Sequence, residues 1–292
     1  MLPVLLDLKF VKIYTFGIFL VLAFFWSSFV LWRNIRLTSY KEDEIFDGLF
    51  IALAGGLFFS RLLYVTLNFD KFGLSIFKFI LINGFPGLSI YGALFGAFVT
   101  FYLYTKLKKI NFKEVIDYMI TPLFIALAFG KLGSFFSASG VGTKTNFFLA
   151  IKYVGYDGLR HLTGLYELIF FALGAYFSYR LLFAVRREKY SKGFVFYFFC
   201  WYFSLTYLLF DKLKVNRLYL IPLKTKIPGI SFNFMISGVI LLTLTIYFLY
   251  YFRNSVLFYG KSSYQKITKK IGGGIAKRGK EAANAYRGAK KK

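Results

Sequence analysis

The sequence has 292 residues, of which 58 % are hydrophobic, 23 % are aromatic and 17 % are charged. Soluble domains carry roughly a quarter charged residues and cannot bury this much apolar surface, so the composition excludes soluble and disordered classes and indicates an integral membrane protein. The net charge of +25 is uneven, because residues 253–292 hold 12 Lys or Arg and one acid. The single cysteine, Cys200, excludes an intramolecular disulfide.

Several stretches are long and apolar enough for helices that cross a bilayer, which takes about 20 residues each. They are Ile13–Trp32, Phe46–Leu67, Gly87–Tyr104, Asp117–Phe136, Leu165–Ala184, Gly193–Phe210 and Ile230–Tyr251. These continuous runs lack the alternation of a β-barrel, so they predict an all-α, polytopic membrane protein with about seven transmembrane helices. The first run is too long for the core of a signal peptide and is expected to be retained. Leu74–Ile82 has half the required length and is predicted to lie along the membrane interface.

We expect two regions with different properties. Residues 1–254 form the transmembrane domain, and residues 255–292 form a basic, disordered tail. The basic residues of the loops are nearly balanced between the two sides, so the tail decides the orientation. The positive-inside rule then places the C-terminus in the cytoplasm and the N-terminus outside the cell membrane. We expect the tail to lie on anionic lipid headgroups rather than to bind nucleic acid.

Ionisable residues inside the spans fall into two groups by depth. Asp47, Asp117 and Arg180 lie near the inner ends of their spans and are expected to reach the interface by snorkelling. Arg61 and Lys131 lie about 20 Å from the inner surface, at a rise of about 1.5 Å per residue. A charge at that depth costs about 2.5–3.5 kcal/mol on insertion scales and needs a reason.

Further polar residues lie at the same outer level, near the ends of other spans. They are Tyr14, Tyr91, His161 and Glu167. Any one of them alone is explained by an aromatic belt or by snorkelling. Together with Arg61 and Lys131 they predict one cavity, in which two cations face one acid. A cavity with net positive charge suits an anionic phospholipid.

Several segments, in this order, resemble the prolipoprotein diacylglyceryl transferases, a family of bacterial seven-helix membrane enzymes. They are Tyr14-Thr15-Phe16-Gly17, Gly55-Gly56 with Ser60-Arg61-Leu62-Leu63-Tyr64-Val65, Gly87-Leu88-Ser89-Ile90-Tyr91-Gly92-Ala93-Leu94, Gly130-Lys131-Leu132-Gly133-Ser134 with Ser139 and Gly142, and His161-Leu162-Thr163-Gly164-Leu165-Tyr166-Glu167. The resemblance extends from about Tyr14 to Asn254.

The chain departs from the family pattern at several positions. The family's signature element reads Gly-Arg-Ile-Gly-Asn-Phe-x-Asn-Gly-Glu, and here Lys131, Ser134 and Ser139 replace its Arg, first Asn and Glu. Lysine keeps the charge but does not bind a phosphate bidentately. Tyr91 stands where many members carry histidine. The family's sixth span has an arginine followed four residues later by glutamate, and the best register places Tyr207 and Asp211 there.

The resemblance implies transfer of a diacylglyceryl group from phosphatidylglycerol to the cysteine thiol of a lipoprotein precursor. On this hypothesis Lys131 with Arg61 stabilises the leaving glycerol phosphate, and Tyr91 orients the phosphate or relays a proton. His161 accepts the thiol proton, and the alternative is that it is a surface or helix-capping histidine. Glu167 positions the cations. The substrate-binding residues are completed by Tyr14, Ser134, Gly142 and Tyr166.

The expected partners are phosphatidylglycerol, membrane lipids and a precursor signal peptide with a lipobox cysteine, which enters laterally between helices. The loops Ser137–Gly164 and Asp211–Gly229 are long enough to cover the site. We expect no cofactor, no metal and no nucleic acid. One alternative is a catalytically inactive relative that binds anionic lipid or scaffolds a partner. A small-solute transporter is less favoured, because the sequence has no clear internal repeat and only Pro122 interrupts a span.

Overall fold

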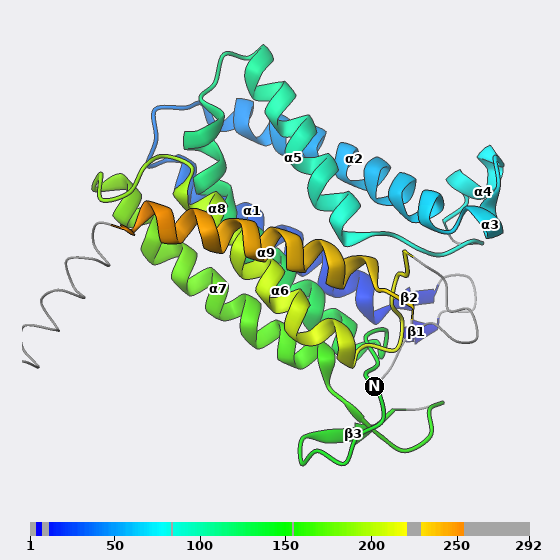
Figure 1. Ribbon diagram of the computed structural model, residues 1–292. Helices are drawn as coiled ribbons and strands as arrows, with labels where there is room; N and C mark the ends of the chain where they lie inside the picture. Colours follow the sequence, from blue (N-terminus) through cyan, green and yellow to red (C-terminus); the bar gives the residue numbers. More distant parts are fainter. Residues whose placement is uncertain (1–3, 8–11, 83, 154, 221–228, 254–292) are drawn as a thin grey trace, which may run out of the picture. The chain divides into compact units, whose positions relative to one another are not determined.

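The computed structural model describes residues 4–7, 12–82, 84–153, 155–220 and 229–253 (Figure 1). Within these residues, seven helices are long and apolar enough to cross a membrane. They are α1 (Thr15–Ile35), α2 (Glu42–Leu67), α5 (Ile90–Leu107), α6 (Phe112–Phe136), α7 (Thr163–Arg186), α8 (Phe194–Phe210) and α9 (Phe232–Tyr251). The predicted all-α, polytopic fold is confirmed. The basic tail predicted at 255–292 lies outside the described residues.

Short elements in the connections complete the fold. In the described part of the chain, two antiparallel strand pairs form: β1 (Val4–Asp7) with β2 (Lys12–Tyr14), and β3 (Ala150–Lys152) with β4 (Leu159–His161). The 3₁₀-helix η1 (Asp211–Leu213) follows α8, and the short helices α3 (Phe69–Phe72) and α4 (Ile76–Ile80) follow α2. The single interfacial helix predicted at Leu74–Ile82 is therefore only partly helical. It is separated from α3 by Gly73, whose positive φ of 58° interrupts the helix.

The chain divides into two compact units, Met1–Leu241 and Leu242–Lys292. Of the second unit, residues 242–253 are described, and residues 242–251 belong to α9. The packing, the cavities and the candidate site described below belong to the first unit.

Helices α2 and α5 pack against each other along their lengths (Figure 1). Glycines make this close approach possible. A Cβ atom at Gly55 would overlap the side chain of Thr100, and one at Gly96 would overlap Phe59 and the backbone of Gly55. Small residues at such contacts are the usual means of helix association in lipid, where close packing replaces the hydrophobic effect.

Pro122 lies inside α6 and removes one backbone hydrogen bond, because proline has no N–H to donate to the carbonyl four residues earlier. That carbonyl belongs to Tyr118. It accepts a hydrogen bond from the side-chain Nδ2 of Asn34 in α1 at 3.1 Å. Asn34 is 1 % exposed. Helix α1 therefore supplies the donor that α6 lacks, and the two helices pack together over their lengths.

Asp117 does not snorkel to the interface, contrary to the prediction. Its side chain is buried, and its two oxygens accept hydrogen bonds from the backbone N–H groups of Gly193 at 2.7 Å and Phe196 at 3.0 Å. These N–H groups begin α8 and have no partner within the helix. Asp117 of α6 thus caps α8, which explains a buried carboxylate at this end. Asp47 and Arg180 are exposed, as snorkelling residues are.

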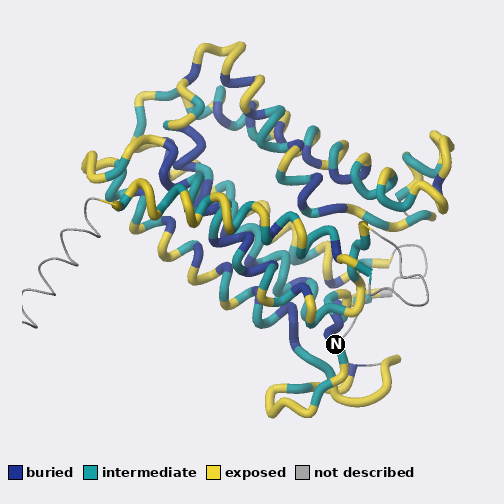
Figure 2. Tube along the Cα trace, viewed as in Figure 1, coloured by how far each residue is buried: buried dark blue, intermediate teal, exposed yellow. Residues whose placement is uncertain are grey.

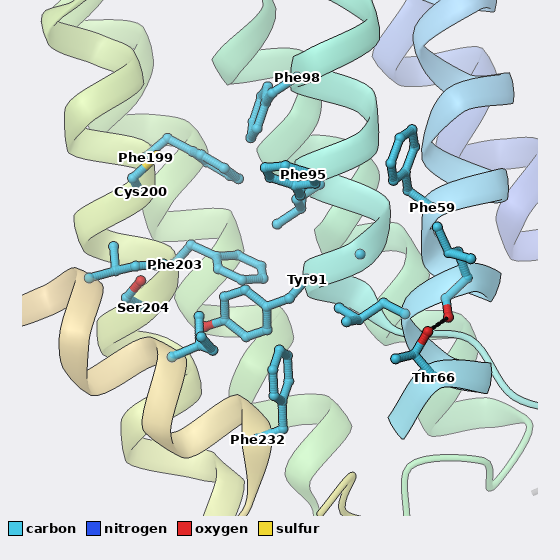
Figure 3. A pocket seen from close by; sticks show the side chains of 16 residues that line it. Phe59, Thr66, Tyr91, Phe95, Phe98, Phe199, Cys200, Phe203, Ser204 and Phe232 are labelled. Atoms are coloured by element: carbon cyan, nitrogen blue, oxygen red, sulfur yellow. Dashed lines mark hydrogen bonds between the residues drawn. The ribbon is translucent and has the colours of Figure 1, made fainter. Parts of the chain in front are cut away.

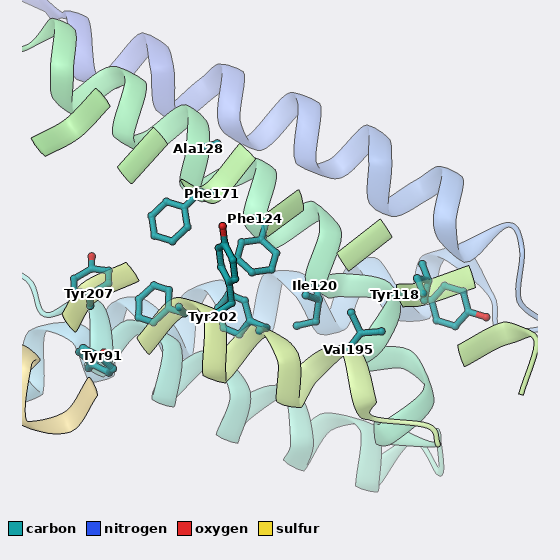
Figure 4. Close-up of a cluster of buried hydrophobic side chains, with 12 residues drawn as sticks. Tyr91, Tyr118, Ile120, Phe124, Ala128, Phe171, Val195, Tyr202 and Tyr207 are labelled. Atoms are coloured by element: carbon teal, nitrogen blue, oxygen red, sulfur yellow. The ribbon is translucent and has the colours of Figure 1, made fainter. Parts of the chain in front are cut away.

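Aromatic side chains form about half of the buried hydrophobic core within the described residues. Its largest cluster includes Phe124 of α6 and Phe171 of α7 (Figure 4). The α8 residues Phe199 and Phe203 belong to the same cluster. Exposed residues recur along the spans (Figure 2). Many of them are large and apolar, among them Val21 and Phe25 of α1. This distribution of apolar residues is typical of helices that face lipid.

Candidate active site

The centre of the candidate site is a buried carboxylate shared by two lysines. Glu167 of α7 is 2 % exposed, and its Oε2 lies 2.8 Å from Nζ of Lys131 in α6. Its Oε1 lies 2.5 Å from Nζ of Lys214, which follows η1. From the sequence, Glu167 is expected to position Arg61 or Lys131, and of these two cations the carboxylate contacts Lys131. Two ammonium groups on one carboxylate leave a net positive charge in a poorly solvated place, where an anion is strongly attracted.

Both lysines also contact Tyr207 of α8. Lys131 Nζ lies 3.4 Å from the Tyr207 hydroxyl, and the Lys214 ammonium lies 4.1 Å from the centroid of its ring. Such cation–π contacts hold an ammonium in place without neutralising it. The other side of the ring stacks on Phe203 and meets Tyr91 edge-on, so α5 and α8 fix its orientation.

A small ladder of extended backbone positions Lys214. Residues 141–143 lie between residues 213–215 and the end of β4, with Gly142 opposite Lys214 and the His161 N–H donating to the Thr143 carbonyl at 3.1 Å. A Cβ at Gly142 would collide with the backbone of His161. Gly142 is therefore required for this ladder, which gives a physical reason for its place among the predicted site residues.

Lys131, Glu167 and Lys214 are here called the two-lysine cluster. A polar cavity of about 970 Å³ opens beside it. The part of the chain that the structure describes contributes residues from the end of α2, from α3, from the segment before α5 and from the segment after η1. Among them are Lys214 of the cluster and the adjoining Tyr207, with Lys71, Arg217 and Asn233. A cavity of this size with cations in its wall is suitable for a phosphate-containing headgroup.

An apolar cavity of about 560 Å³ lies next to it, between α2, α5, α8 and α9 (Figure 3). Its lining is almost entirely aliphatic and aromatic, and Thr66 lines both cavities. An apolar cavity adjoining a polar one has the two chemistries of a phospholipid, with an acyl chain on one side and a headgroup on the other.

Tyr91 projects into the apolar cavity, with Phe203 and Phe232 around its ring (Figure 3). Its hydroxyl lies 2.5 Å from Ser237 Oγ, and Ser237 itself donates to the Asn233 carbonyl at 2.6 Å. Because the one hydrogen of Ser237 is used, Tyr91 donates in this pair. The chain of hydrogen bonds leads from Tyr91 to Asn233, in the wall of the polar cavity.

Arg61 lies apart from the two-lysine cluster, contrary to the predicted shared cavity. The guanidinium is buried and donates to the carbonyls of Lys78, Phe79 and Gly87 at 2.7, 2.9 and 2.8 Å. These acceptors belong to α4 and to the segment that leads into α5. Arg61 therefore ties the connection between α2 and α5 to α2.

The other predicted site residues occupy several different places. His161 lines a separate apolar cavity of about 400 Å³ with Tyr166, and its buried Nδ1 has no hydrogen-bond partner within the described residues. Ser134, in the last turn of α6, accepts a hydrogen bond from the Oγ of Ser139 at 3.2 Å. Tyr14 is exposed and pairs with Val4 across the first hairpin.

Metal-binding groups do not gather anywhere in the described part of the chain. No three His, Cys, Asp or Glu side chains in residues 4–7, 12–82, 84–153, 155–220 and 229–253 lie close enough to hold a metal ion together.

Comparison with known proteins is decisive about the family. The family described as prolipoprotein diacylglyceryl transferase matches residues 3–251. The chain belongs to this family. It is accordingly a transferase of lipoprotein biosynthesis and a multi-pass membrane protein.

Curated relatives cover most of this prolipoprotein diacylglyceryl transferase. Each bears the name phosphatidylglycerol–prolipoprotein diacylglyceryl transferase. The relative from Clostridioides difficile is 29 % identical over 232 residues, which is 79 % of this chain and 90 % of the relative. That from Clostridium novyi is 26 % identical over 248 residues, 82 % of this chain and 94 % of the relative. That from Finegoldia magna is 28 % identical over 234 residues, with shares of 79 % and 90 %.

Sequence reasoning did not single out Lys214 among the candidate site residues. It treated the loop Asp211–Gly229, which contains Lys214, only as a segment long enough to cover the site. The signal available was the family register, which places Tyr207 where an arginine is expected. Loss of a cation there is a reason to look for another cation nearby, and the structure has Lys214 over the ring of Tyr207.

Proposed function

We propose that this transferase moves a diacylglyceryl group from phosphatidylglycerol to the thiol of a cysteine in a lipoprotein precursor. The observation that carries the proposal is the pair of adjoining cavities, one polar and beside the two-lysine cluster, the other apolar, with Thr66 in both walls. The names of the curated relatives supply the donor and the acceptor.

The reaction exchanges one bond at carbon. The cysteine sulfur attacks the glycerol carbon of the diacylglyceryl group, and a carbon–sulfur bond forms. The bond from that carbon to the phosphate oxygen breaks, its electron pair stays on oxygen, and glycerol phosphate leaves. The departing phosphate gains negative charge, which the net positive charge of the Lys131–Glu167–Lys214 cluster stabilises.

The thiol must lose its proton, because the thiolate is the nucleophile. We assign this proton to His161, whose buried Nδ1 has no partner within the described residues and whose ring lies in an apolar cavity beside Tyr166. His161 is separated from Lys214 by the extended segment 141–143. Two strand spacings of about 4.8 Å put the backbones of His161 and Lys214 roughly 10 Å apart. Two further residues are proposed to bind the lipid. They are Tyr91, which lines the apolar cavity, and Ser134, in the last turn of α6.

The test is a transfer assay with purified protein, phosphatidylglycerol labelled in its diacylglyceryl group, and a lipobox peptide. Label is expected on the cysteine peptide and absent from the same peptide with serine in place of cysteine. Lys131→Ala is expected to abolish transfer, whereas Arg180→Ala, at the other end of the bundle, keeps it. Lipid binding without product at any protein concentration identifies the inactive relative instead, and equal losses in both variants contradict the assigned site.

We further propose that the N-terminus lies on the outer side of the cell membrane and the C-terminus on the cytoplasmic side. The test uses single cysteines in a Cys200→Ser background, labelled in intact cells with a membrane-impermeant maleimide. Lys144→Cys, in the loop that contains the 141–143 segment, is expected to be labelled. Lys189→Cys, in the loop between α7 and α8, is expected to be labelled only after the cells are broken. The reverse pattern contradicts the orientation.

A further inference from the structure

The cations around the polar cavity differ in how they face it. The described residues of its wall include three cations, Lys71, Lys214 and Arg217. Lys71 is exposed, and the guanidinium of Arg217 is engaged by the backbone carbonyls of Lys212 and Lys214. Lys214 differs from both, because its side chain is only 16 % exposed and its ammonium carries no backbone contact among the described hydrogen bonds.

Lys131 is not part of this wall. Its ammonium lies on the other oxygen of Glu167 and reaches the hydroxyl of Tyr207 rather than the cavity. One carboxylate can neutralise one ammonium fully. If Lys131 keeps Glu167, the charge of Lys214 remains for a ligand that enters from the cavity.

We propose that Lys214, rather than Lys131, binds the phosphate of the donor lipid, and that Lys131 is a positioning residue that acts through Glu167. This inference rests on the proposed function and names the residue that meets the headgroup. A phosphate oxygen takes the place of Glu167 Oε1 at the Lys214 ammonium, while Lys131 retains Glu167 Oε2. The ring of Tyr207, 4.1 Å from the ammonium, holds Lys214 in place during the exchange.

The contacts around Lys214 give its ammonium the fixed orientation that a bidentate guanidinium would have by its own shape. A lysine is a point charge without the fork of a guanidinium, so it depends on its surroundings for orientation. Here the Lys214 backbone is held by Gly142 on one side and by its own N–H bond to the Asp211 carbonyl at 3.1 Å on the other. The ammonium is then fixed between Glu167 and Tyr207.

The test separates binding from transfer. The variants are Lys214→Gln, which keeps a hydrogen-bonding side chain without the charge, Lys214→Arg, which keeps the charge, and Lys212→Ala as the matched control. Lys212 lies two residues away, is exposed, and has its ammonium over Phe234. Two quantities are measured in detergent: the rise in unfolding temperature on adding glycerol phosphate, and the KM for phosphatidylglycerol in the transfer assay.

Lys214→Gln is expected to lose the stabilisation by glycerol phosphate and to raise the KM about 10-fold or more, because a charge-assisted hydrogen bond is removed. Lys214→Arg keeps the charge and is expected to recover part of both quantities relative to Lys214→Gln. Lys212→Ala is expected to stay near the wild type in both measurements. The unfolding temperature without ligand reports whether each variant folds, and if Lys214→Gln does not fold, Lys214→Met serves in its place as the uncharged variant of similar length.

The outcomes distinguish this inference from the proposed function. If the wild type transfers the lipid and Lys214→Gln has the same KM and the same stabilisation by glycerol phosphate, the role of Lys214 is overturned and the proposed function stands. Stabilisation by glycerol phosphate that requires Lys214, without any transfer, supports the phosphate site and overturns the function. Absence of stabilisation in the wild type overturns the phosphate site.

Discussion

The carboxylate of Glu167 in α7 forms an ion pair with Lys131 of α6, with 2.8 Å between Oε2 and Nζ, and Glu167 is only 2 % exposed. Removing one partner from a buried ion pair leaves the other charge uncompensated, which costs about 3–5 kcal/mol. The pair therefore contributes both to the site and to the contact between α6 and α7.

Glu167→Gln is the first prediction that follows. With its carboxylate gone, two ammonium groups face each other without a counter-ion, so we expect a lower unfolding temperature and a large loss of transfer. Adding Lys131→Met removes one of the two cations, so the double variant is expected to regain part of the unfolding temperature but not the activity. Additive effects of the two substitutions on the unfolding temperature contradict the coupling.

The sequence predicted the spans well and the side-chain contacts less well, for a physical reason. Hydropathy and length determine whether a segment crosses the membrane, and all seven predicted spans overlap the observed helices. Helical rise then gives the depth of a residue but not the direction in which its side chain points. Arg61 illustrates this limit, because its depth suggested a partner for Lys131 while its guanidinium contacts the carbonyls of the α2–α5 connection.

The loops were the least predictable part. Lys214 reaches Glu167 only because residues 213–215 pair with residues 141–143, a contact between distant segments that no local pattern indicates. The short strands β3 and β4 were missed for a different reason, because three residues carry too little periodicity to be recognised.

Arg61→Gln is predicted to loosen the α2–α5 connection. Glutamine cannot satisfy the three carbonyls that the guanidinium bonds, and a buried unsatisfied carbonyl costs about 1–3 kcal/mol. We expect faster limited proteolysis between α3 and α5 and a lower unfolding temperature. Arg180→Gln, an exposed arginine of α7, is the control. Unchanged proteolysis in Arg61→Gln would show that the carbonyl contacts do not hold this segment.

Asn34→Leu is predicted to destabilise the protein without touching the site. Leucine leaves the Tyr118 carbonyl, already deprived of a donor by Pro122, without a partner in an apolar surrounding. We expect a lower unfolding temperature, equivalent to about 1–3 kcal/mol, and an unchanged KM for phosphatidylglycerol. Pro122→Ala restores the backbone donor, so Asn34→Leu is expected to cost less in that background. An equal cost in both backgrounds contradicts this account.

Gly142→Ala is predicted to reduce transfer by displacing Lys214 and His161 together. The new Cβ meets the His161 backbone, and the 141–143 segment has to move away from one of its neighbours. Gly130→Ala is the matched control, since a Cβ there has open space around it and lies next to Lys131 in the sequence. We expect Gly142→Ala to lose stabilisation by glycerol phosphate as well as activity, while Gly130→Ala retains both. Retention of both by Gly142→Ala would mean that the ladder does not determine where the Lys214 ammonium lies.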